Sequence, residues 1–278
     1  MNLFKGRRVC VATMHKKESM IGPLFEKAFE VTYTTADALN TDAFGTFSGE
    51  KERINSPIET ARQKCLAAFD LTQLDLVIAS EGSFGPHPLY GFLPCDEELV
   101  LLKDFKNDLE FSMTHRSTTT NFSLTTVSSF EAATQFLKQI GFPQHAVIIK
   151  IPNTPILYKG IDTTGTFGQL FHQLLKNHSV IHLETDMRAH YNPTRMQVIR
   201  ETVVKLIDKI KCVCPACQHP GYSVTQSIPG LPCGHCLLPT RSTLAHVSTC
   251  TKCQFSEENK FPLGKREEDP MYCDFCNP

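Results

Sequence analysis

The stretch from residue 214 to residue 276 contains four Cys-x-x-Cys pairs, which read CPAC (214–217), CGHC (233–236), CTKC (250–253) and CDFC (273–276). A pair with this spacing lets one tight turn direct two thiolates at a single cation, and two such turns complete a tetrahedral zinc site. The stretch therefore predicts two structural zinc ions. Their expected ligands are Cys214, Cys217, Cys233, Cys236, Cys250, Cys253, Cys273 and Cys276.

The spacing leaves the pairing of the four turns open. Consecutive pairing gives gaps of 15 and 19 residues between the turns of each site, which is typical of a zinc ribbon. Interleaved pairing, first turn with third and second with fourth, would give a cross-braced unit. Either way the segment is too short to bury a large core, so we expect zinc to supply much of its folding free energy.

Composition and charge describe the rest of the chain. The 278 residues are 41% hydrophobic, which is enough for a substantial core, and the length favours one sizeable domain plus a smaller one, or two domains. The net charge is −1, and the residues from Lys211 onward carry six Lys or Arg against six Asp or Glu. A general nucleic-acid or membrane binder usually has a basic excess, so nucleic acid is possible but not favoured and no membrane partner is expected. No apolar run reaches membrane-spanning or signal-peptide length, which predicts a cytoplasmic protein.

Residues 1–210 alternate strand-like and helix-like stretches, which predicts an α/β domain with a mixed sheet and flanking helices. A small zinc-ribbon-like domain is expected over residues 211–278. Strands are expected over residues 9–13, 31–34, 76–79, 146–151 and 180–183, and a hairpin over 98–103 and 109–113. Helices are expected over residues 20–29, 57–71, 130–140, 167–176 and from 192 onward.

Two helix starts carry clear signals. Ser56, Pro57 and Glu59 have the spacing of a capping box with proline in the first turn. Asn192 and Pro193 mark the start of the last helix in the same way.

Polar residues cluster where predicted strands end, which is where open α/β sheets place their ligands. His15, Lys16 and Lys17 follow the first strand, and there an ammonium group and free backbone N–H groups could meet a phosphate. The glycine-rich loop 42–50, with Thr46, could bring the backbone close to a ligand. Both stretches could instead be ordinary solvated loops.

The stretch SEGSFGPHP (80–88) places Glu81 at the end of a buried strand, where a carboxylate suits Mg²⁺. Ser83 follows it in a loop rich in glycine and proline, but no G-x-S-x-G elbow marks Ser83 as a nucleophile.

The stretch ETDMRAHYNPTR (184–195) is dense in charge for a connection. Its guanidinium groups could chelate phosphate beside a helix N-terminus, and its carboxylates could hold a metal. Alternatively, these groups form surface ion pairs that position the last helix. The candidates are Glu184, Asp186, Arg188, His190, Asn192 and Arg195.

Taken together, the stretches 13–15, 42–50, 80–88 and 184–196 and the cysteine tail resemble an uncharacterised bacterial family known only as a domain of unknown function, with a C-terminal cysteine-rich zinc module. This resemblance covers essentially the whole chain and implies no activity.

Residues 8–115 also resemble, more distantly, the inosine/xanthosine triphosphate pyrophosphatases. The similarity lies in ATMHKK (12–17), ETAR (59–62) and ASEG (79–82), followed by a hairpin. His15 replaces the asparagine of that family, and the usual second acid beside the Glu-Gly segment is missing. The resemblance therefore implies either a metal site completed by another carboxylate or nucleotide binding without catalysis.

These observations favour a metal-dependent phosphohydrolase that acts on a nucleotide, with Mg²⁺ at the catalytic site and two structural Zn²⁺ ions. The expected partner is a small phosphorylated ligand. The alternative is a non-enzymatic ligand sensor, or a protein or nucleic-acid binder that docks through its zinc module. In the leading hypothesis Glu81, Asp186, Glu184 and Lys16 are catalytic, and His15, Lys17, Thr46, Ser83, Arg188, His190, Asn192 and Arg195 contact the substrate.

Overall fold

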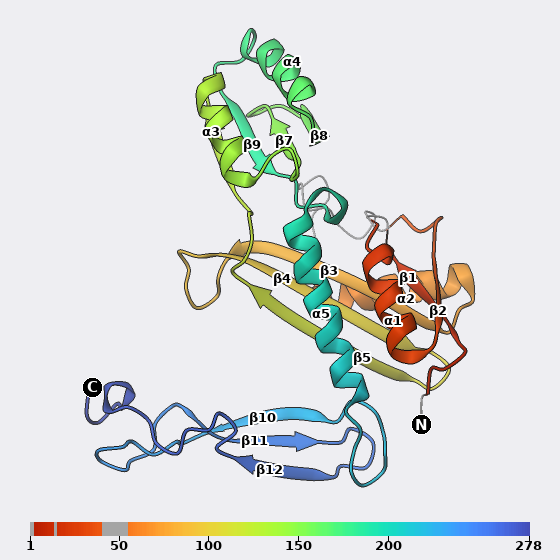
Figure 1. The fold of residues 1–278 in the computed structure, drawn as a ribbon, viewed down its shortest axis with the longest axis vertical. Helices are drawn as coiled ribbons and strands as arrows, with labels where there is room; N and C mark the ends of the chain where they lie inside the picture. The colour runs from red at the N-terminus through yellow and green to blue at the C-terminus, as the bar shows by residue number, and fades with distance from the viewer. Residues whose placement is uncertain (1–2, 14–15, 41–54) are drawn as a thin grey trace. The chain divides into compact units, whose positions relative to one another are not determined.

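The computed structural model describes residues 3–13, 16–40 and 55–278 (Figure 1). The chain divides into an N-terminal unit, Asn2–Leu206, and a C-terminal unit, Ile207–Pro278. The division falls inside helix α5 (Pro193–Lys211). Among the described residues, no helix combines the length and the apolar character needed to cross a membrane.

A five-stranded mixed sheet forms the first part of the N-terminal unit, in the order β2-β1-β3-β4-β5. The central strand β3 pairs in parallel with β1, which pairs in parallel with β2, whereas β3, β4 and β5 form an antiparallel meander. The strands are β1 (Arg8–Ala12), β2 (Thr32–Thr35), β3 (Leu76–Pro86), β4 (Pro94–Asp104) and β5 (Leu109–Ser117).

Helices cover both faces of this sheet. Helix α2 (Pro57–Thr72) packs on one face through Ala61, Cys65 and Ala68, small residues that let the helix lie close to Val77 and Ala79 of β3. Helices α1 (Glu18–Phe29) and α5 lie on the side that faces the viewer in Figure 1. Because side chains alternate along a strand, successive residues of β3 and β4 lie in turn on the face covered by α2 and on the face covered by α5.

A second sheet of four antiparallel strands, in the order β6-β9-β7-β8, completes the N-terminal unit. Helices α3 (Phe130–Ile140) and α4 (Thr164–Leu175) pack on it around a core that includes Phe136, Phe167, Phe171, Ile149 and Leu183. The strands are β6 (Leu124–Val127), β7 (Val147–Lys150), β8 (Leu157–Ile161) and β9 (Ile181–Thr185).

In the C-terminal unit, β10 (Ser223–Pro229), β11 (Thr243–Thr249) and β12 (Ser256–Lys260) form an antiparallel sheet in chain order. The four cysteine turns lie before β10, between consecutive strands, and after the short 3₁₀ helix Pro270–Tyr272. The hairpin strands thus bring turns that are far apart in sequence to common ends of the sheet.

The predicted α/β class with a mixed sheet and a small cysteine-bearing domain is confirmed, as is the capping box at Ser56 and Glu59. One element differs clearly from the prediction. The strand expected over residues 76–79 continues to Pro86, because β4 pairs with it in register from Asp104 to Pro94. The segment 80–86, which its glycines and proline predict as a loop, is therefore the second half of a central strand. The short strands β6 and β8 are further elements that the sequence pattern does not predict.

Candidate metal centres and a buried charge cluster

Two groups of four cysteines converge in the C-terminal unit, and within each group the Sγ atoms all lie within 4.8 Å of one another. Four thiols at this separation suit a tetrahedral zinc ion, which takes four thiolates in closed structural sites. The pairing is interleaved, because the first turn joins the third and the second joins the fourth. The groups are Cys214, Cys217, Cys250 and Cys253, and Cys233, Cys236, Cys273 and Cys276.

Backbone geometry supports thiolates at both centres. The residue after the second cysteine has a left-handed conformation in three turns, with φ of 59° at Gln218, 61° at Leu237 and 61° at Gln254. Backbone N–H groups, first that of Cys253, lower the pKa of Cys250 to about 6. At the other centre the backbone N–H of Cys236 is the main cause that lowers the pKa of Cys233 to about 7. Zinc is bound by thiolates, so each centre has a cysteine prepared to lose its proton.

The N-terminal unit contains an unusual group of buried ionisable side chains, here called the charge cluster. Lys, Arg, Asp and Glu are rarely buried in folded proteins unless they are paired, so such a group calls for a physical explanation. Its six members are at most 9% exposed: Lys17, Lys64, Glu81, Asp96, Glu98 and Arg195.

The charge cluster spans both faces of the sheet beside the point where β1 ends at Ala12. Glu81 lies on the α2 face and forms an ion pair with Lys64 of α2. Glu98 lies opposite Gly82 in the β3–β4 register, and therefore on the α5 face. The parallel strand β1 stops beside Ala79, and the turn that follows it delivers Lys17 to the side chain of Ser80.

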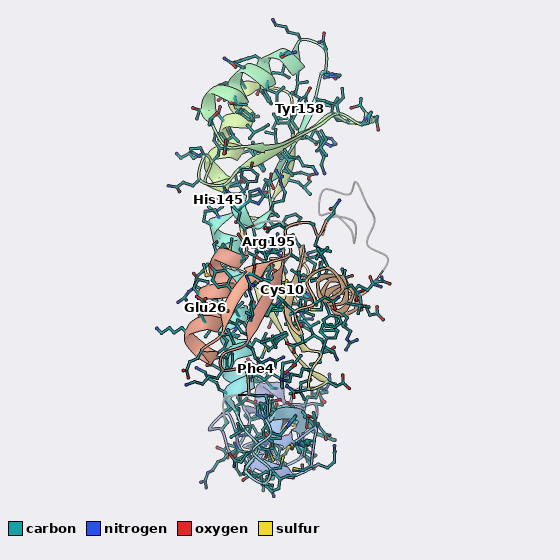
Figure 2. All side chains as sticks on the ribbon, turned by 90° about the vertical axis from the view of Figure 1, so that its right-hand side faces the viewer. Phe4, Cys10, Glu26, His145, Tyr158 and Arg195 are labelled. Carbon is teal, nitrogen blue, oxygen red and sulfur yellow. The ribbon has the colours of Figure 1, made fainter. Side chains whose placement is uncertain are left out.

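On the α5 face, Arg195 and Glu98 form a fully buried ion pair, with 2.6 Å between Nε and Oε1. Arg195 lies in the first turn of α5, inside the unit (Figure 2). It also donates to the carbonyl oxygen of Met187, and its guanidinium lies 5.0 Å from the ring centre of Phe84. A Cβ at position 82 would lie 2.5 Å from Glu98 Oε1, so only glycine lets this pair approach β3.

Lys17 and Asp96 are the members whose protonation is most strongly perturbed. Burial, reinforced by the positive charges of Arg195 and Lys64, lowers the pKa of Lys17 to about 7. Its Nζ donates to Ser80 Oγ at 3.0 Å. Burial and the negative charge of Glu98 raise the pKa of Asp96 to about 8. Asp96 is fully buried, and no donor group in the described part of the chain hydrogen-bonds to either of its carboxylate oxygens; the neighbouring Glu98 carboxyl raises its pKa both by charge and by hydrogen bonding.

A second, outer group lies in the connection from β9 into α5, around the 3₁₀ turn Ala189–Tyr191. Arg188 Nη2 is 2.7 Å from Asp186 Oδ2, and the Arg188 guanidinium stacks 4.6 Å from the ring centre of Tyr191. The backbone N–H of Gly160 donates to the same Asp186 oxygen at 3.0 Å. Burial, followed by the charge of Arg188, lowers the pKa of His190, and Lys16 contributes to this shift.

The predicted site residues therefore fall into two groups. Lys17, Glu81 and Arg195 belong to the charge cluster. Asp186, Arg188 and His190 belong to the outer group, and the exposed Lys16 acts on it through its charge at His190. Asn192 connects the two, since its Oδ1 accepts from the backbone N–H of Arg195 and its Nδ2 contacts the Asp186 carbonyl oxygen.

Two predicted residues lie elsewhere, and two lie outside the described residues. Glu184 forms an ion pair with Lys150 of β7 at 2.7 Å. Ser83 is partly buried on β3, opposite Glu97 of β4. His15 and Thr46, with the whole loop 42–50, lie outside the residues that the structure describes.

Sequence reasoning missed Lys64, Asp96 and Glu98. Asp96 and Glu98 directly precede the apolar run Leu99–Leu102 in the same strand. Acidic residues next to such a buried run could have indicated that the acids are themselves buried. Lys64 carried no signal of its own, because a lysine within a helix usually faces solvent.

A family model described as "Domain of unknown function (DUF6671)" matches residues 64–278, and the chain belongs to this family. No curated protein matches the chain. Among solved structures, the crystal structure of protein VC0702 from Vibrio cholerae aligns over 73% of this chain and 94% of its own, with a TM-score of 0.32 and 8% identity. A likeness of this degree supports no argument about fold or function.

Proposed function

We propose that the N-terminal unit is a metal-dependent hydrolase of a phosphorylated nucleotide, similar in its reaction to nucleoside triphosphate pyrophosphatases, and that the C-terminal unit is a structural zinc module. The observation that carries this proposal is the buried mixture of carboxylates and cations at the carboxyl end of β1, beside β3. Phosphoryl chemistry needs both signs together, because carboxylates hold the metal and cations hold the phosphates. Strand carboxyl ends are where open α/β sheets bind ligands.

The cations are placed to attract an anion. Lys17 occupies the N-cap position of α1, and Arg195 lies in the first turn of α5, so the helix dipoles add to their charges. Arg195 is fully buried and already bound to Glu98, so its role is to set the local charge. Lys16 and Arg188, which are more exposed, are the residues proposed to contact phosphate oxygens directly.

Glu81 is proposed to act through the metal. Mg²⁺ takes one or two carboxylates and leaves its other positions to water and phosphate, and when bound it activates the attacking water. Glu81 is 3% exposed and paired with Lys64, so it is held in place rather than free to move into solvent. The four-thiolate zinc centres offer no open position to substrate, which makes a structural role the better assignment for them.

The test is a screen of nucleoside triphosphates, including deaminated and oxidised bases, for release of pyrophosphate or phosphate with Mg²⁺ present. Glu81→Gln should abolish turnover because it removes a charge while keeping the shape. The matched control is Glu110→Gln, which loses only an exposed ion pair with Arg62. Far-UV circular dichroism of both variants establishes that they fold. A broad screen without turnover in the wild-type protein would refute the proposal.

A ligand sensor without catalysis is the second candidate, and a specific observation favours it. Glu81, Glu98 and Asp186 are each already engaged by a cation, namely Lys64, Arg195 and Arg188. Ion pairs in which each carboxylate is already neutralised by a protein cation can form a rigid binding site that holds a ligand without hydrolysing it. Saturable nucleotide binding by calorimetry, together with no turnover in the screen, would establish the sensor.

A further inference from the structure

We infer that Asp96 and Glu98 of β4 form a divalent-cation site on the α5 face of the central sheet. The two residues are two positions apart on one strand, so their side chains project from the same face. Both are fully buried. The cation proposed is Mg²⁺ or Mn²⁺, which prefer carboxylate oxygens and accept as few as two protein ligands. A role in hydrolysis rests on the proposed function, whereas the binding itself does not.

The cations of the charge cluster have partners other than Asp96. Lys64 pairs with Glu81, Arg195 pairs with Glu98, and Lys17 donates to Ser80. These contacts of the three cations go to groups other than Asp96, on which Arg195 and Lys17 act through their charges.

Three carboxylate oxygens of these two acids lack a hydrogen-bond donor within the described part of the chain. Both Asp96 oxygens and Glu98 Oε2 are buried without a hydrogen-bond donor among the residues described, while Glu98 Oε1 accepts from Arg195. Burial of a carboxylate without a donor is costly, and the charges of Arg195 and Lys17 offset only part of that cost, so the pKa of Asp96 is raised to about 8. A bound cation beside these three oxygens would compensate the remaining cost.

The neighbours of Asp96 and Glu98 on β3 limit the number of protein ligands at this site. Position 82, directly opposite Glu98, is a glycine, and position 84, opposite Asp96, is Phe84, whose ring lies against Arg195. The missing side chain at position 82 lets the Glu98 carboxylate and the Arg195 guanidinium lie against the β3 backbone, which holds Glu98 on the same face as Asp96. Among the described residues the only groups of three or more ligands that converge within 4.8 Å are the two cysteine centres, so this site has two protein carboxylates and would leave further positions to water or phosphate.

The experiment measures Mn²⁺ binding to the full-length, zinc-loaded protein by electron paramagnetic resonance after overnight dialysis. Dialysis allows slow entry into a buried site. The wild-type protein should bind Mn²⁺ and Asp96→Asn should bind at least tenfold more weakly, because it removes a ligand charge and keeps the shape. Glu97→Gln is the matched control. It removes the same charge from the position between the two acids, and the wild-type Glu97 forms an ion pair with Arg116 outside the charge cluster. This variant should bind as the wild type does.

A second readout is thermal stability. Mg²⁺ that binds only the folded state should raise the melting temperature of the wild type and of Glu97→Gln, but not that of Asp96→Asn. No Mn²⁺ binding by the wild type, or equal binding by Asp96→Asn, would overturn the inference. In that case Asp96 holds a proton and Arg195 offsets the charge of Glu98, and Asp96→Asn should be stabilising without any response to Mg²⁺. Mn²⁺ binding without turnover would refute the hydrolase and keep the cation site. Turnover by the wild type, together with equal Mn²⁺ binding by the wild type and Asp96→Asn, would refute the cation site and keep the hydrolase.

Discussion

Replacing Arg195 with methionine should destabilise the N-terminal unit severely, because it leaves Glu98 charged and fully buried. The Nε–Oε1 distance is 2.6 Å and neither side chain is exposed. Removing one partner of a buried ion pair costs about 3–5 kcal/mol. Arg195→Met also leaves the Met187 carbonyl oxygen without its donor, so we expect a loss toward the upper end, about 4–5 kcal/mol.

The double variant Glu98→Met/Arg195→Met tests whether the loss comes from the uncompensated charge. Replacing both members of a buried pair with apolar residues of similar size is often neutral or stabilising. The double variant should therefore lose less than about 2 kcal/mol. With Glu98→Met as the second single variant, the cycle should give a coupling energy of about 3 kcal/mol or more. Arg116→Met removes an arginine from the exposed pair with Glu97 and should cost less than about 1 kcal/mol.

Urea unfolding followed by far-UV circular dichroism measures these changes, since the chain has no tryptophan. The measurements are made with zinc present and without added Mg²⁺ or Mn²⁺. A chromogenic chelator reports release of zinc from the C-terminal unit, so that its unfolding is followed separately. A loss below about 1 kcal/mol for Arg195→Met, or a double variant as unstable as the sum of the single variants, would refute the reasoning.

Three further predictions concern other parts of the chain. With interleaved pairing, Cys217→Ala/Cys250→Ala disrupts one centre and should retain about one zinc ion, whereas Cys217→Ala/Cys236→Ala disrupts both and should retain none. Consecutive pairing predicts the reverse, and elemental analysis distinguishes the two. Burial raises the pKa of Asp104, but the stronger combined effect of hydrogen bonds from Arg7 and Asn107 leaves it below its usual value. The stability that this shift contributes is complete above the unfolded pKa of about 4 and is lost as the pH falls through the folded pKa. In Asp104→Asn the free energy of unfolding in urea should therefore depend less on pH between about pH 5 and pH 2 than in the wild type. Parallel pH profiles of the two proteins would contradict this. Ser56→Ala should cost about 1 kcal/mol in the same assay through loss of the α2 cap, and an unchanged midpoint would count against it.

The cysteine centres show what local sequence specifies and what it does not. The spacing within each turn identifies the ligands, because two thiolates on one turn need only four consecutive residues. The pairing of turns depends on which strand ends lie together. Interleaving follows from the antiparallel order β10-β11-β12, which no spacing within a single turn encodes.

The charge cluster shows the same limit in the N-terminal unit. The helix cap before Arg195 predicts a phosphate ligand, yet Arg195 is bound to Glu98, which lies 97 residues earlier in the chain. Of the two adjacent lysines, the sequence pattern favours Lys16 for catalysis. The structure has a left-handed φ of 56° at Lys16 and a buried Lys17 that reaches Ser80. Which of two neighbouring side chains turns inward depends on one backbone conformation, and composition does not determine it.

Gly82 explains why the sequence predicts the wrong secondary structure where the cluster forms. Glycine in SEGSFGP suggests flexibility, and Gly85, which has open space where a side chain would begin, fits that interpretation. At Gly82 the requirement is different. A side-chain carbon there would lie 2.5 Å from Glu98 Oε1 and 2.6 Å from Arg195 Nη2, and both of those side chains are fully buried, so neither can move into solvent. Glycine is therefore required at this position of β3, because the Glu98 carboxylate from β4 and the Arg195 guanidinium from α5 form their ion pair directly against its backbone.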